Sequence, residues 1–141
     1  MSVGANARTF ILKTEEGEAT HRRFLNGTTA KSEGDMVTLT SNVLEAVADS
    51  NLVGAVGVCA TDIAASAYGT VYLTGMFNGE AATGADFGIG DFVYNADATE
   101  LDTGTNGDVP VGKVVHTDPA SGGTVHFELW SIILKQIDVK A

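Results

Sequence analysis

The sequence predicts an all-β protein, a small barrel or sandwich of short strands. Three observations lead to this prediction: 17 of the 141 residues are glycine and only 2 are proline, hydrophobic residues make up 44% of the chain, and short apolar runs alternate with turn-forming residues. Such a composition, rich in Gly, Thr and Val, favours short strands and tight turns over long helices. The length is that of one domain.

We expect about eight short strands between residues 34 and 130. The apolar or alternating segments are residues 36–40, 43–47, 52–60, 70–77, 91–95, 109–116 and 124–130, with a short return at 100–101. Asn-Gly pairs and Gly-rich clusters between them indicate turns, among them Asn78-Gly79. The pattern predicts a core made of Val37, Leu39, Val53, Val56, Val58, Val71, Leu73, Phe92, Tyr94, Val111, Val114, Val125 and Phe127.

The chain divides into an N-terminal arm (residues 1–33), a β-domain (34–130) and a C-terminal tail (131–141). The arm has two small apolar pieces separated by charged residues, which cannot form a core alone, so it needs something to lie against. The tail is expected to be extended and is too apolar for a solvated end. We expect it to pair with residues 10–12 or to contact a neighbouring subunit through Ile132, Ile133, Leu134, Ile137 and Val139.

Charge is unevenly distributed along the chain. The net charge is −10, which argues against binding to nucleic acid or to an anionic membrane. Residues 1–31 hold five of the eight bases, whereas residues 32–112 hold twelve acids and no base. A slightly basic arm therefore precedes a strongly acidic body.

Cellular context follows from three absences in the sequence. Cys59 is the only cysteine and lies in an apolar run, so we expect a buried thiol and no intramolecular disulfide. No secretion signal opens the chain, and no apolar run approaches the roughly 20 residues of a membrane helix. The sequence thus predicts a soluble protein made in a reducing compartment.

Candidate catalytic and metal sites are weak. No Ser lies in a G-x-S-x-G motif, and the G-x-G at residues 88–90 leads into a strand rather than a helix. His116 and His126 lie on strands that we expect to be neighbours, so they could meet, but no motif supplies a third and fourth metal ligand. We therefore expect no enzyme, no cofactor and no metal.

An acidic hairpin leaves one alternative open. It spans residues 97–108 and contains Asp97, Glu100, Asp102 and Asp108. A calcium loop counted from Asp102 would need an oxygen ligand at Gly104 and a bidentate Glu at Lys113, so the match is loose. Whether this hairpin binds a cation, or serves a hydrolase, is left open by the sequence.

Small-residue motifs recur in a particular order through the body. They include G-D-x-V, G-D-x-V-Y and h-G-x-V, where h is apolar, and they lie within residues 33–39, 53–62, 69–75, 87–94, 111–115 and 123–129. This order resembles the capsid decoration, or cement, proteins of tailed bacteriophages over residues 33–129. Cys59 stands where that family often has a smaller residue.

The resemblance implies a β-barrel or β-tulip domain that binds the outside of an assembled phage head, usually as a homotrimer, with the major capsid protein as its partner. It implies a structural virion protein, made in the host cytoplasm. On this interpretation the basic arm is mobile in free protein and orders on the capsid through Phe10, Ile11, Leu12, Arg22, Arg23, Phe24 and Leu25. The alternative is a β-module that binds a small ligand or glycan, such as a fibre or adhesin head.

Overall fold

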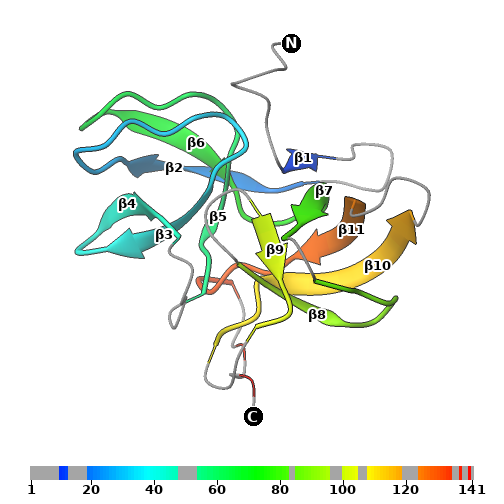
Figure 1. The fold of residues 1–141 in the computed structure, drawn as a ribbon. Coiled ribbons are helices and arrows are strands. Elements are labelled where there is room, and N and C mark those ends of the chain that lie inside the picture. Colours follow the sequence, from blue (N-terminus) through cyan, green and yellow to red (C-terminus); the bar gives the residue numbers. More distant parts are fainter. Residues whose placement is uncertain are drawn as a thin grey trace.

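The computed structural model describes residues 10–12, 19–47, 54–82, 85–95, 100–104, 108–118, 124–134, 137 and 140. In this part of the chain there are eleven strands and no helix, and hence no helix able to cross a membrane. The strands form two sheets that lie side by side (Figure 1). The all-β, barrel-like prediction is confirmed.

The first sheet closes into a five-stranded barrel. The sheet has six strands, and β1 lies outside the ring of five: β1 (Ile11–Leu12), β7 (Met76–Ala81), β8 (Phe92–Asn95), β9 (Glu100–Asp102), β10 (Gly112–Asp118) and β11 (Thr124–Leu129). They follow the order β1-β7-β11-β10-β8-β9, and parallel pairing of β7 with β9 closes the ring. Because one edge of β7 is taken by β11, β1 and β9 share its other edge at different heights.

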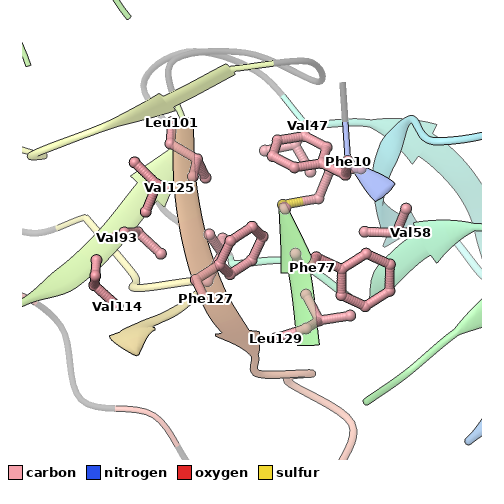
Figure 2. Close-up of a cluster of buried hydrophobic side chains, with 13 residues drawn as sticks. Phe10, Val47, Val58, Phe77, Val93, Leu101, Val114, Val125, Phe127 and Leu129 are labelled. Carbon is pink, nitrogen blue, oxygen red and sulfur yellow. The ribbon is translucent and has the colours of Figure 1, made fainter. Parts of the chain in front are cut away.

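Alternation along the strands fills this barrel. Val125, Phe127 and Leu129 of β11 point inward, while the residues between them face outward. Aromatic rings occupy the centre: Phe127 meets Phe10 edge-on at a centroid distance of 5.8 Å and Phe77 at 6.2 Å. Figure 2 shows these rings surrounded by valines and leucines from the neighbouring strands.

The second sheet has five strands and a core of its own. Its order is β2 (His21–Leu25), β6 (Tyr68–Tyr72), β5 (Gly57–Cys59), β3 (Met36–Thr40) and β4 (Val43–Ala46). The two edge strands approach each other at a single parallel bridge between Asn26 and Leu44. The sheet therefore curls around a second cluster of buried residues, formed by Val37, Leu44, Val56, Cys59, Ile63, Val71 and Leu73.

The predicted strand at residues 70–77 is in fact two strands in different sheets. The chain leaves β6 after Tyr72 and enters β7 at Met76, and Gly75 between them has φ 139°, a value that favours glycine. Asn78-Gly79 was expected to be a turn but lies inside β7, where a Cβ at Gly79 would meet the ring of Phe10. The close contact of Gly79 with Phe10 thus outweighs the local preference of Asn-Gly for a turn.

The core prediction holds except at three positions. Leu39 is only partly buried against the second cluster, and Val53 lies outside the described residues. The prediction for Phe92 was wrong, because its side chain is 49% exposed and Val93 points inward instead. In β8, Val93, Tyr94 and Asn95 are all buried, so simple alternation does not describe this strand.

The described part of the arm is packed on the body, contrary to the expectation of a mobile segment. Phe10 is 1% exposed in the barrel core, β1 pairs with β7, and β2 pairs with β6 over its whole length. The physical reason is that apolar side chains of the arm complete the packing of the two cores. Phe10 fills the space that Gly79 leaves open.

The described part of the tail contacts its own chain. Residues 131–134 form a turn rather than an extended segment, with the Leu134 N–H donating to the Ser131 carbonyl. The Ile132 N–H donates to the Ala55 carbonyl at 2.9 Å. The predicted pairing of the tail with residues 10–12 is not seen in the described part of the tail, which bonds to Ala55 and Asp108 instead.

Candidate functional site

The exposed positive charge of the described residues is concentrated on one strand at a sheet edge. We define the basic edge as His21, Arg22 and Arg23 of β2 together with Tyr68 of β6. All four are exposed, Tyr68 at 63%. The guanidinium of Arg23 lies over the Tyr68 ring, 5.8 Å from its centroid, a cation–π contact that holds the charge at the surface.

The strand that carries the basic edge is anchored at both ends. At its start, the Thr20 N–H donates to the Thr74 hydroxyl at 3.0 Å. The His21 ring lies edge-on to the Tyr72 ring, with the two centroids 6.5 Å apart. At its end, Phe24 packs against the second core. The two arginines therefore project from a fixed strand rather than from a flexible arm.

Another base of the predicted arm is not available to a partner. Lys31 is buried, and its Nζ donates to Asn26 Oδ1 at 2.9 Å and to the Thr29 carbonyl at 2.6 Å. Asn26 in turn donates to the carbonyls of Ile63 and Ala64. Lys31 therefore stabilises the connection between two loops. The remaining two bases, Arg8 and Lys13, lie outside the described residues.

The predicted apolar anchors of the arm are mostly inside the molecule. Phe10 is in the barrel core, Leu12 packs against that core, and Phe24 packs against the second core. Leu25 is half-buried, and only Ile11 is clearly exposed. The structure thus brings Arg22 and Arg23 to the surface and takes Phe10 away from it.

The tail residues chosen as subunit contacts are divided between core and surface. Ile132 packs against the second core, whereas Ile133 and Leu134 are exposed. Ile137 is half-buried, and Val139 lies outside the described residues. Ile133 and Leu134 therefore form an apolar turn at the surface.

Sequence reasoning missed an aromatic face on the barrel. The Phe92 and Trp130 rings contact each other at a centroid distance of 5.6 Å and an angle of 59°, and the Lys113 ammonium lies over the Phe92 ring. Val115 and Ile89 are exposed as well. The signal that could have indicated this face is Lys113, which lies directly opposite Phe92 in the pairing of β10 with β8. Residues directly opposite each other share a face of the sheet, and a lysine normally faces solvent, so Phe92 faces solvent too.

The described side chains provide no activated nucleophile at the cavity between the sheets. A cavity of about 230 Å³ lies between the sheets, lined mainly by apolar groups that include Phe10, Cys59 and Tyr72. Burial, followed by the nearby charge of Asp35, raises the pKa of the Cys59 thiol to about 12, so the nucleophilic thiolate is strongly disfavoured.

The acidic hairpin does not assemble a cation site in the described part of the chain. Asp102 accepts a hydrogen bond from the Thr103 N–H, Asp108 is buried, and Asp97 lies outside the described residues. Over the described ranges, no three side chains among His, Cys, Asp and Glu converge to hold a metal ion.

Comparison with known proteins decides between the open interpretations. A family model described as phage cement protein matches residues 25–129. The chain belongs to the phage cement protein family. No curated protein and no solved structure matches it. This cement protein is thus a structural phage protein and a capsid component, a role that favours a non-enzymatic domain over a hydrolase. The match begins at Leu25, so His21, Arg22 and Arg23 of the basic edge precede the matched region, whereas Tyr68 lies within it.

Proposed function

We propose that this cement protein binds the outer surface of an assembled phage head and stabilises it, with the major capsid protein as its partner. The observation that carries the proposal is the family match over residues 25–129. A protein that binds the assembled shell but not its separate subunits stabilises the shell by mass action. The acidic composition supports the outer rather than the inner surface, because packaged DNA repels a protein with a net charge of −10.

The basic edge is the proposed capsid contact. Arg22 and Arg23 are exposed on a strand that is already ordered, so binding does not have to order a flexible segment. Arginine pairs well with carboxylates because its planar guanidinium donates two parallel hydrogen bonds. We therefore expect acidic side chains on the facing capsid surface.

Charge reversal tests this contact. Undecorated heads are mixed with wild-type protein or with the Arg22→Glu/Arg23→Glu double variant, and occupancy is measured at low and at high salt. We expect the double variant to lose occupancy at low salt and the wild type to lose it as salt screens the contact. Deletion of residues 2–30 is unsuitable, because it would also remove Phe10 and β2.

Lys113→Glu is the matched control. It reverses an exposed positive charge on the barrel, away from the basic edge. The control changes the net charge by −2 and the double variant by −4, so a loss of occupancy about half as large in the control would point to net charge alone. Equal occupancy of the double variant and the wild type at both salts would remove the basic edge from the mechanism.

We further propose that the protein acts as a homotrimer, with the exposed turn at Ile133 and Leu134 as one subunit contact. Three linked binding sites on one shell raise the overall affinity without any new contact, because the second and third binding events become intramolecular. The apolar turn supports this proposal because a neighbouring subunit that covered Ile133 and Leu134 would remove apolar surface from water.

A further inference from the structure

A β-bulge aligns two histidines on the outer face of the barrel. In a regular ladder, Val114 opposite Phe127 would place Val115 opposite His126. The ladder between β10 and β11 instead shifts after Val114, so that Val115 is the extra residue and His116 becomes the partner of His126. Bulges of this kind re-aim a side chain and disturb the ladder locally. Here the residue that is re-aimed is a histidine, and its new neighbour is a histidine.

The spacing of the pair lies just within the reach of one shared metal ion. The ring centroids are 6.3 Å apart and the rings are nearly perpendicular, at 82°. With metal–nitrogen bonds of about 2.0–2.1 Å, two imidazoles on one ion have centroids about 4.5–6.4 Å apart, depending on the angle at the metal. The observed separation is at the upper end of this range. Because His116 is exposed, a small rotation of its side chain would bring the rings closer.

The surroundings favour a cation over an anion. On β7, Asn78 lies opposite His126, and Glu80 is the next outward residue. Glu128 of β11 and Lys113 of β10 face each other on the opposite side of the pair, and Ile11 of β1 lies beside Asn78. The described groups thus contain two acids and one base, in a protein with a net charge of −10 that attracts cations.

We propose that His116 and His126 form a two-histidine site for a late first-row divalent metal ion, such as Ni²⁺, Cu²⁺ or Zn²⁺. Neutral imidazole suits these ions, and water or a second molecule fills the remaining positions. A bound ion links β10 to β11 across the bulge. Because folding brings the two rings together, the ion stabilises the folded barrel. This site is independent of capsid binding.

The test uses Ni²⁺ as the probe and the full-length protein at pH 7.5. We expect saturating Ni²⁺ to raise the unfolding temperature by about 3 °C or more, and Mg²⁺ to have no effect. Isothermal titration should give one Ni²⁺ per chain. Loss of a group that only orients a metal ligand weakens binding 10–100-fold, so His116→Gln and His126→Gln should each weaken it at least tenfold.

His21→Gln is the matched control, since His21 is the third histidine and lies on the other sheet. It should respond to Ni²⁺ like the wild type. Circular dichroism checks that each variant is folded. This check matters most for His126→Gln, because His126 is half-buried with its Nε2 out of contact with solvent, whereas His116 is exposed. No Ni²⁺ binding by the wild type, or undiminished binding by both the His116 and His126 variants, would overturn the proposal. A lost response in His21→Gln alone would place the ion elsewhere.

Discussion

Two phenylalanines of the same barrel differ in what they contribute to stability. Phe127 is fully buried and touches two other rings, whereas Phe92 is half exposed on the outer face. We expect Phe127→Ala to lower the free energy of unfolding by about 3–5 kcal/mol. Phe92→Ala should cost about 1 kcal/mol, since much of its ring is already in water. Urea denaturation measures both, and equal losses would contradict the inward orientation of Val93.

Cys59 makes stability depend on pH in the alkaline range. Burial raises the pKa of its thiol from an ordinary 9.0 to about 12 in the folded protein. The folded state therefore holds this proton more tightly than the unfolded state, and the free energy of unfolding falls as pH rises from about 9 to 12. Below pH 9 both states are protonated and the effect vanishes.

Cys59→Ala isolates this contribution, because other groups also titrate at alkaline pH. The difference in stability between wild type and variant should be constant up to about pH 9 and then shift in favour of the variant. Ellman's reagent gives a second measurement: at pH 8 the thiol should react only after unfolding. Rapid reaction in the native protein would show that Cys59 is accessible.

At the scale of elements, the β3–β4 hairpin turns on two residues that are not glycine. Ser41 and Asn42 have φ values of 52° and 68°, as a type I′ turn requires. Asn-Gly is the preferred pair for this turn. We expect Ser41→Asn with Asn42→Gly to raise the free energy of unfolding by about 0.5–1 kcal/mol. Ser41→Val is the control and should destabilise, because β-branched residues avoid positive φ.

The two-residue strand β1 tests whether the arm is part of the fold. Phe10 is 1% exposed, whereas its neighbour Ile11 is 39% exposed. Phe10→Ala should cost about 3–5 kcal/mol and Ile11→Ala no more than about 1 kcal/mol. Thermal unfolding compares the two variants directly. A Phe10 variant as stable as the wild type would show that this part of the arm does not contribute to the stability of the fold.

At the scale of the whole molecule, two proposed contacts respond to salt in opposite ways. Each chain carries −10, so subunits of a trimer repel one another, and salt should strengthen self-association by screening. Head binding through the basic edge should weaken under the same conditions. Sedimentation at about 20 and 300 mM salt, compared with head occupancy, separates the two contacts.

Substitution in the exposed turn tests the subunit contact itself. Leu134→Glu places a charge at an apolar contact and should shift the trimer toward monomer at micromolar concentration. Thr61→Glu adds the same charge at an exposed position elsewhere and should leave the equilibrium nearly unchanged. A Leu134 variant that associates as well as the wild type would rule out the turn as a contact.

Several features of the fold and of the candidate site could be predicted from the sequence. Short alternating runs predicted the strands at residues 36–40, 43–47 and 124–130 within a few residues. The meeting of His116 with His126 also followed from strand order, since sequential strands joined by a short loop tend to pair. The body motifs indicated the family. These features depend on local pattern and chain connectivity, which the sequence carries directly.

Tertiary packing alone decided which face of a strand is covered and which residues belong to the core. Alternation states which residues share a face but not which face meets the interior, so Phe92 was assigned inward. Phe10 joined the core because Gly79, far along the chain, leaves room for its ring. Lys31, one of the five bases within residues 1–31, is buried where its ammonium donates to Asn26 and to the Thr29 carbonyl. Each of these outcomes depends on contacts between residues that are not neighbours in the chain, and local sequence patterns do not specify such contacts.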